Sequence, residues 1–145
     1  MDKIRRVMRV NRNGNIDGYD GYMDAECIDL CNALNEVDGI TTTESCCGHY
    51  INAYHIWMYA TSAYAISVLA RAVDRRYLVS NQLWKIEVET VETPESSPVM
   101  FILDLHSEAP YADEKSMEDD CNSIIASLNY WASDKYKEYF EHGDQ

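Results

Sequence analysis

The sequence predicts an α+β fold, in which helices pack against an antiparallel sheet of four to five strands. Apolar residues recur at helical spacing in three segments, and four short segments rich in β-branched and aromatic residues lie between them. The resulting order is helix, strand, strand, helix, strand, strand, helix. Because strands joined by short loops pair antiparallel, each pair of strands is expected to form a hairpin.

A single domain, 1–145, is expected, because 145 residues of which 46% are apolar suffice for one core and not for two. Residues 1–21 end in NRNGNIDGYDG and are expected to form a turn-rich amino-terminal segment, although 3–10 could add a fifth strand. Residues 132–145 are expected to be an exposed, charged tail.

The first helix is predicted over about 23–37, with Asp24 at its amino-terminal cap and Gly39 ending it. Its apolar stripe consists of Met23, Cys27, Leu30, Cys31, Leu34 and Val37. Residues 40–45 are β-branched and too few for a helix, so they predict a strand that runs into a loop at 46–49.

The second strand is predicted over 53–59. Its two alternating sets are Tyr54, Ile56 and Met58 on one side and His55, Trp57 and Tyr59 on the other. Both sets are bulky, which favours a strand covered on both faces, or one with a face lining a pocket. Ser62 is placed to cap the second helix. The apolar stripe expected for that helix is Ile66, Leu69, Ala70, Val73 and Tyr77.

Two further strands are predicted over 84–89, where apolar and charged residues alternate, and over 99–105 (VMFILDL). The segment TPESSP between them is expected to be a loop. Ser116, with Asp119 three residues later, is expected to begin the last helix. Its stripe is Met117, Cys121, Ile124, Ile125, Leu128 and Trp131.

The charge disfavours bulk nucleic acid as a partner, unless the basic amino-terminal arm binds it. Residues 1–12 carry five basic side chains and one acidic, which leaves a net charge of −17 for the remainder of a chain whose total is −13. Such a surface repels phosphates. There is no run of 18 uncharged apolar residues and no signal peptide, so a cytoplasmic protein without a membrane partner is expected. Five cysteines, an odd number, indicate free thiols, and those on helical stripes are expected to be core residues.

The segment 44–49, Glu-Ser-Cys-Cys-Gly-His, is the most distinctive part of the sequence. Small residues and a glycine at the end of a strand let backbone N–H groups approach a ligand closely. The expected ligand-binding residues are Glu44, Ser45, Cys46, Cys47, Gly48, His49, His55, Trp57 and Tyr59. Since neighbouring strand residues point to opposite sides, only one of the two loop cysteines can face the core.

The same residues allow two other interpretations. Cys47 and His49, with Cys46 or His55, could hold zinc, and a loop cysteine activated by a histidine could act as a nucleophile. Neither is preferred, so no metal, cofactor or catalytic residue is assigned.

Two weaker candidates lie elsewhere. Asn13, Asn15, Asp17, Gly18 and Asp24 loosely match a calcium loop, and Arg71, Arg75 and Arg76 could reach a phosphate, although salt bridges to acids are expected.

ITTTESCCGHY after an amphipathic helix resembles the TTSSCSGR-type motif of the wybutosine-biosynthesis tRNA methyltransferase family, as LWKIEVE at 83–89 resembles that family's next strand. Ser45, Cys46 and Gly48 match the motif, whereas Ser stands at position 47 and Arg at position 49 in that family. The segment resembles more closely small uncharacterised phage and prophage proteins that carry an ESCCGH loop. These resemblances cover residues 23–105 and imply a loop that faces a ligand.

Together these observations favour a non-catalytic protein that binds a small nucleotide-like ligand. The phage resemblance implies a sponge for a host immune nucleotide signal, acting in the host cytoplasm. The alternatives are an S-adenosylmethionine-dependent or thiol enzyme and an acidic inhibitor that docks on a host defence protein. A homo-oligomer is also compatible with the sequence.

Overall fold

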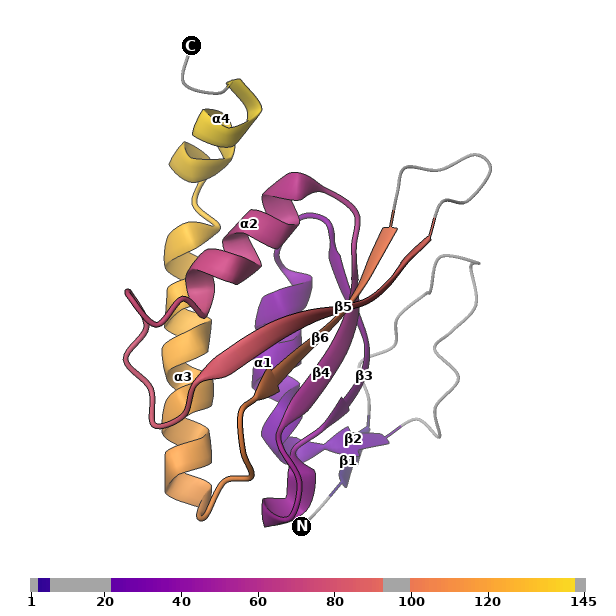
Figure 1. Cartoon of the computed structure of the whole chain (residues 1–145), viewed down its shortest axis with the longest axis vertical. Helices are drawn as coiled ribbons and strands as arrows, with labels where there is room; N and C mark the ends of the chain where they lie inside the picture. Colours follow the sequence, from indigo (N-terminus) through magenta and orange to yellow (C-terminus); the bar gives the residue numbers. More distant parts are fainter. Residues whose placement is uncertain (1–2, 6–21, 93–99, 143–145) are drawn as a thin grey trace.

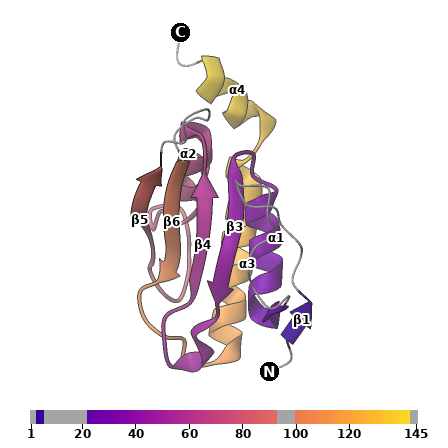
Figure 2. The ribbon, with the colours of Figure 1, turned by 90° about the vertical axis from the view of Figure 1, so that its right-hand side faces the viewer.

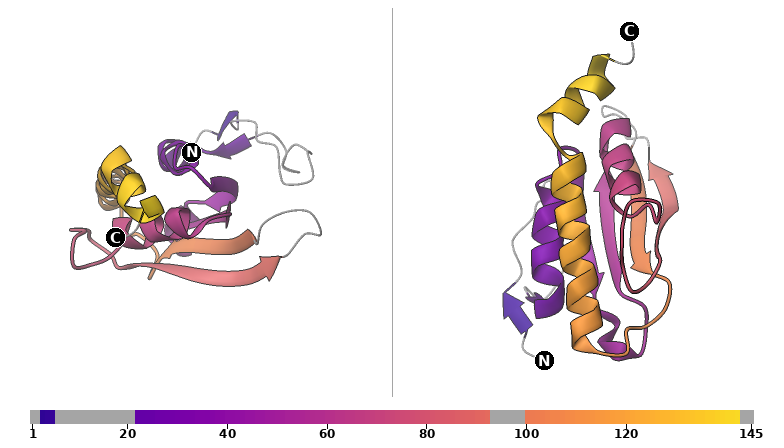
Figure 3. Two further views of the ribbon diagram at one scale, coloured as in Figure 1. Left: turned by 90° about the horizontal axis from the view of Figure 1, so that it is seen from above. Right: turned by 90° about the vertical axis from the view of Figure 1, so that its left-hand side faces the viewer.

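The antiparallel sheet predicted from the sequence is present, and three helices cover one of its faces (Figures 1 and 3). The computed structural model describes residues 3–5, 22–92 and 100–142. The elements in chain order are β1 (Lys3–Arg5), β2 (Tyr22–Asp24), α1 (Ala25–Asn35), β3 (Ile40–Cys46), the 3-10 turn η1 (Gly48–Tyr50), β4 (His55–Ala60), α2 (Ala63–Ala72), β5 (Trp84–Glu92), β6 (Met100–Ser107), α3 (Glu114–Trp131) and α4 (Asp134–His142).

The sheet has the strand order β3-β4-β6-β5, and all neighbours are antiparallel (Figure 2). The hairpins β3/β4 and β5/β6 meet where β4 pairs with β6. The fifth strand considered for 3–10 is not part of this sheet, because its described part, β1, pairs with β2 in a separate ribbon. The loop expected at TPESSP lies outside the described residues, as do residues 6–21 with most of the calcium-loop candidate.

The faces of β4 differ in burial. Ile56, Met58 and Ala60 are completely buried beneath the helices, whereas the residues between them are only partly buried. The interpretation that β4 is covered on both faces is wrong, since α1, α2 and α3 all lie on the same side of the sheet (Figure 3). We call the uncovered side, which bears His55, Trp57 and Tyr59, the open face.

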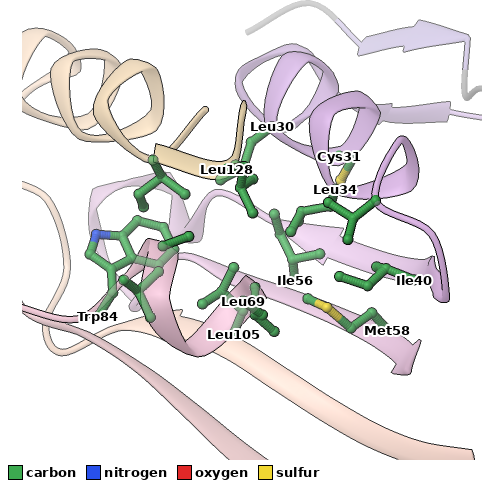
Figure 4. Close-up of a cluster of buried hydrophobic side chains, with 14 of the residues drawn as sticks. Leu30, Cys31, Leu34, Ile40, Ile56, Met58, Leu69, Trp84, Leu105 and Leu128 are labelled. Atoms are coloured by element: carbon green, nitrogen blue, oxygen red, sulfur yellow. The ribbon is translucent and has the colours of Figure 1, made fainter. Parts of the chain in front are cut away.

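The core lies between the helices and the side of the sheet that they cover (Figure 4). Its fully buried members include Leu30 and Leu34 of α1, Ile56 and Met58 of β4, Leu69 of α2, Leu105 of β6 and Leu128 of α3. Cys27, Cys31 and Cys121 are buried within it, which confirms that the helical cysteines are core residues. Burial raises the pKa of Cys121 to about 12.

Side chains cap the amino-terminal ends of α2 and α3, and one of the two predicted caps is wrong. Ser62 caps α2 as predicted, since its Oγ accepts a hydrogen bond from the Ala65 N–H at 3.0 Å. The predicted start of α3 at Ser116 is wrong: Asp113 is the cap, and its carboxylate accepts the Ser116 N–H at 2.7 Å. Asp and Ser are equally good caps, and Asp113 comes three residues earlier in the chain.

Asp24 occupies the cap position of α1, but its side chain forms no cap hydrogen bond. It points instead toward the loop after β3. The helix begins after Met23, which lies in β2, and it ends at Asn35 instead of continuing to Val37. Gly39 lies in the following turn with φ +93°.

Two features of the other helices differ from the expected pattern. In α2, Ala70 and Tyr77 of the predicted stripe are exposed, and the buried residues are Tyr64, Ala65, Val68, Leu69 and Ala72. At the carboxyl end, residues within the expected tail form α4. Its Tyr136 packs against the core and hydrogen-bonds Ser67 of α2.

Candidate functional site

The connection from β3 to β4 is a tight turn at the lower end of the sheet in Figure 2. Gly48, His49 and Tyr50 have φ values of 84°, 50° and 64°, so three successive residues adopt the left-handed conformation. Two of them are not glycine, and such residues persist there only when their surroundings hold them. The turn therefore fixes the direction of the His49 side chain.

His49 points at Asp24, which lies at the start of α1. The distance from His49 Nε2 to Asp24 Oδ2 is 3.3 Å, and the same oxygen accepts the Cys47 N–H at 3.2 Å. Cys46 completes the group, because one donor atom from each of Asp24, Cys46 and His49 lies within 4.8 Å of the other two. We call these three residues the Asp-Cys-His cluster. Asp24 is 6% exposed, whereas half of the His49 side chain is exposed.

The two loop cysteines point to different environments, as the alternation of a strand predicts. Cys47 is completely buried, and burial raises the pKa of its thiol to about 12. Its sulfur lies 3.7 Å from His49 Nδ1. A thiol with that pKa supplies almost no thiolate near neutral pH, which argues against Cys47 as a nucleophile. Cys46 is partly exposed, and its sulfur accepts the Gly48 N–H at 3.4 Å.

A second group of polar and aromatic residues occupies the open face of β4 and β6. The rings of His55 and Trp57 are stacked, with centroids 5.0 Å apart and an interplanar angle of 6°. His106 of β6 pairs with His55 across the strands and stacks on its ring, again at 5.0 Å. These three rings form a row that we call the aromatic row.

Carboxylates fix the two imidazoles of this row. Asp104, which is 5% exposed, contacts His55 Nδ1 with both oxygens at 2.8 and 2.9 Å. His106 contacts Glu87 of β5 through Nε2 at 2.8 Å and the carbonyl of Ser107 through Nδ1 at 2.8 Å. Burial lowers the pKa of His106, but the hydrogen bonds to Ser107 and Glu87 outweigh it, and the net pKa is raised. The carboxylate of Glu87 thus faces an imidazole that is more readily protonated than usual.

The structure divides the sequence-predicted residues into three sets. The first set lies on β3 and β4, where Glu44 is opposite Trp57 and Cys46 is opposite His55. Its members are Glu44, Cys46, His55, Trp57 and Tyr59. Ser45 lies opposite the buried Ile56, and its hydroxyl oxygen is buried, so Ser45 and Cys47 belong to the inner side. Gly48 and His49 form the turn at the sheet's end.

Sequence reasoning missed three residues that complete these groups: Asp24, Asp104 and His106. Asp24 was interpreted only as a helix cap or a calcium ligand. Asp104 and His106 interrupt the apolar strand VMFILDLHS at alternate positions, which places both on one face of a strand. That alternation was the available signal, because polar residues rarely occur in a buried strand without a partner.

A groove of about 570 Å³ lies between α1 and α3 near the same end of the molecule. Its lining includes Glu26, Asp29, Glu114 and Glu118, with Tyr50 from the turn. Four carboxylates make it a poor place for an anionic ligand. The groove therefore does not support a nucleotide phosphate.

Two of the three arginines considered for phosphate binding, Arg71 and Arg76, contact other residues of the chain. Arg76 forms an ion pair with Asp74 at 2.7 Å and, through its hydrogen bonds, lowers the pKa of Asp74 to about 2. Arg71 lies over the Trp131 ring, 5.3 Å from its centroid. The salt bridge expected from the sequence is present for Arg76.

Comparison of the chain with protein-family models, with curated proteins and with solved structures finds no match in any of the three. Within the part of the chain that is described, no helix combines the length and the apolar character needed to cross a bilayer.

Thiol accessibility gives a direct check on this arrangement. Brief alkylation of the native protein, in the presence of a chelator, is expected to modify Cys46 first, because the other four thiols are buried. Peptide mapping by mass spectrometry identifies the labelled residue. Modification of Cys47 or Cys121 before Cys46 would contradict the orientation of the two loop cysteines.

Proposed function

We propose that this chain is a non-catalytic binding protein for a small nucleotide-like ligand whose base stacks on the open face beside Trp57. The observation that carries the proposal is the aromatic row together with the position of Tyr59. Aromatic side chains on the open face of a sheet are a recurrent means of stacking bases. All the residues involved are held in register by the paired strands β3, β4 and β6.

The spacing along β4 favours a slot for one planar ring. Residues two apart on a strand are separated by about 6.7 Å, and a ring between two others needs roughly 7 Å, twice the optimal carbon contact distance. His55 covers one face of the Trp57 ring, with centroids 5.0 Å apart, and Tyr59 follows Trp57 on the same face of β4. No ring contact joins Trp57 to Tyr59 in the described residues. In the proposed binding mode, a base inserts between these two rings.

The edge of this slot carries one available hydrogen-bond acceptor. Glu44 lies opposite Trp57 on β3 and is exposed, whereas Asp104, opposite Trp57 on β6, is buried and holds His55 with both oxygens. A carboxylate accepts hydrogen bonds from exocyclic amino and ring N–H groups, which favours a base that presents such a donor at this edge. Lys85 pairs with His106 at the other end of the row and supplies a cation for one phosphate. The remaining acidic surface disfavours a polynucleotide.

The biological setting follows from the resemblance to ESCCGH-containing phage proteins. A protein that binds a nucleotide without converting it removes that nucleotide from solution, and a phage would use this to sequester a host immune signal. The proposed place of action is the cytoplasm of the infected host.

Titration calorimetry with adenosine, guanosine and a cyclic dinucleotide tests the proposal. At least one of these probes is expected to bind, and Trp57→Ala is expected to raise its Kd about tenfold or more, since stacking a base contributes about 1–3 kcal/mol. Tyr130→Ala is the matched control, because Tyr130 is 71% exposed on α3, far from β4 in sequence and on the covered side. Equal affinity of Trp57→Ala and wild type would refute the slot. Failure of every probe would refute the proposal and favour an acidic docking protein.

A thiol enzyme is the second candidate, because Cys46 lies opposite His55 and Asp104 holds the His55 ring. Directly opposed residues have Cβ atoms about 4.5–5.5 Å apart. If His55 activates Cys46, His55→Ala will slow alkylation of Cys46 at neutral pH about tenfold or more. An unchanged alkylation rate would exclude this candidate and leave the binding protein.

A further inference from the structure

The Asp-Cys-His cluster is not required for stacking a base on the open face, and its chemistry points elsewhere. A carboxylate, a thiol and an imidazole converge from two segments separated by more than 20 residues. We propose that Asp24 Oδ2, Cys46 Sγ and His49 Nε2 form a Zn²⁺ site with a fourth position open to solvent. This proposal is independent of the nucleotide-like ligand.

The distances between the donor atoms fit the ion. Zn²⁺ binds sulfur at about 2.3 Å and nitrogen or oxygen at about 2.0–2.2 Å, so the edges of its tetrahedron are roughly 3.4–3.6 Å. The 3.3 Å between His49 Nε2 and Asp24 Oδ2 is already close to such an edge. The Cys46 sulfur, within 4.8 Å of both partners, needs only a small side-chain adjustment to close the other two.

Neighbouring groups orient each ligand, as is usual around a protein-bound metal. The Cys47 N–H holds the Asp24 carboxylate, and the Gly48 N–H donates to the Cys46 sulfur, which stabilises a thiolate. His49 Nδ1 lies next to the Cys47 sulfur, which leaves Nε2 directed at Asp24. The left-handed turn is what holds the imidazole in this direction.

The electrostatic surroundings favour a cation over a bare cluster. Asp24 is nearly completely buried, and Glu26, two residues later, has a buried Oε1 without a hydrogen-bond partner among the described residues. Negative charge that is withdrawn from water is stabilised most effectively by a positive ion.

The donor set selects among ions. A thiolate ligand disfavours Mg²⁺ and Ca²⁺, which prefer oxygen. One sulfur, one nitrogen and one oxygen suit Zn²⁺, and three protein ligands leave a coordination position free. Half of the His49 side chain is exposed, so that position faces solvent.

The test uses Co²⁺ as a spectroscopic probe on the full chain, followed by competition with Zn²⁺. One equivalent of Co²⁺ is expected to bind and give a thiolate-to-metal charge-transfer band, which Zn²⁺ then abolishes. Asp24→Asn, Cys46→Ser and His49→Ala are each expected to raise the Zn²⁺ Kd at least about 100-fold, because loss of even a ligand's supporting partner costs 10–100-fold. Asp24→Asn keeps an oxygen that accepts the Cys47 N–H.

Matched controls separate a site from adventitious binding. His106→Ala and Cys121→Ala remove a histidine and a cysteine outside the cluster, and both are expected to retain the band and the affinity. Circular dichroism of each variant checks that it is folded. Absence of the band in the wild type would overturn the site. So would a Zn²⁺ affinity in all three ligand variants that equals the affinity of the wild type. Loss of nucleoside binding in Trp57→Ala with the band intact would separate this result from the proposed function.

Discussion

Replacing Asp120 with alanine is expected to lower the free energy of unfolding by about 3–5 kcal/mol. Asp120 is 1% exposed in the middle of α3, yet its carboxylate is fully used. One oxygen accepts the Asn81 N–H at 2.7 Å, and the other accepts the Gln82 N–H at 3.1 Å and the Tyr111 hydroxyl at 2.5 Å. Alanine would leave the buried Tyr111 hydroxyl without this acceptor and would remove the charged partner of two partly buried backbone N–H groups, and hydrogen bonds to charged groups contribute about 1.5–3 kcal/mol each.

The carboxylate also fixes the approach to β5. Tyr111 accepts the indole N–H of the buried Trp84 at 2.9 Å, so a chain of hydrogen bonds links α3 to the first residue of that strand. Burial, then the hydrogen bond to Asp120, raises the pKa of Tyr111 well above its ordinary value, which keeps the hydroxyl protonated as a donor. Loss of Asp120 would therefore loosen the edge of the sheet as well as the loop before it.

Asp119→Ala is the matched control for this effect. Asp119 is the preceding residue, about half exposed, and forms an ion pair with Lys115 one turn away. Such exposed pairs contribute less than about 1 kcal/mol. Urea unfolding of both variants gives the comparison, and a loss below about 1 kcal/mol for Asp120→Ala would show that the network does not stabilise the fold.

The sheet and three of its helices could be predicted because periodicity is a local property. The helical stripe of Leu30, Cys31 and Leu34 correctly reports which face is buried. The alternation along 84–89 predicts the strand, although only Trp84 of its apolar residues is buried and Val88 is 59% exposed. The start of α3 was misplaced because Asp113 and Ser116 are both suitable caps three residues apart. The helix α4 was missed because only Tyr136 among its described side chains packs on the core, too weak a pattern among charged residues.

The candidate sites were predictable only in part, since they depend on pairing between distant segments. The loop 46–49 and the face of β4 could be identified from their composition. The partners Asp24 and Asp104 lie 25 and 49 residues from the histidines they contact, His49 and His55. Nothing local in the sequence specifies that β4 pairs with β6 instead of β5. The strand order therefore decides which carboxylate meets which histidine.

Gly48→Ala is expected to destabilise the fold and to disrupt the Asp-Cys-His cluster together. Gly48 has φ +84°, and an added Cβ would lie 2.8 Å from the carbonyl oxygen of Ala53. That oxygen belongs to the backbone leading into β4, so it cannot move without displacing the hairpin. The left-handed conformation costs about 1–2 kcal/mol, and the overpacking about 1–3 kcal/mol more.

The same substitution should weaken metal binding because Gly48 connects two of the three ligands. Its N–H donates to Cys46, its carbonyl accepts the N–H groups of Ile51 and Asn52, and His49 follows it directly. A turn displaced away from Ala53 would carry the imidazole away from Asp24. The expected result is a loss of about 2–5 kcal/mol in the free energy of unfolding and a tenfold or greater rise in the Zn²⁺ Kd.

Gly39→Ala separates the two effects. Gly39 has a similar φ of +93°, and its added Cβ would lie 2.9 Å from the side-chain oxygen of Ser62. Gly39 precedes the first residue of β3, whereas Gly48 follows the last, so the two glycines lie at opposite ends of this strand. It should therefore lose stability through backbone strain yet bind Co²⁺ and Zn²⁺ with wild-type affinity. Urea unfolding and metal titration of both variants provide the measurement. If Gly48→Ala binds Zn²⁺ as tightly as Gly39→Ala does, the left-handed turn does not position His49, and the cluster owes its geometry to Asp24 alone.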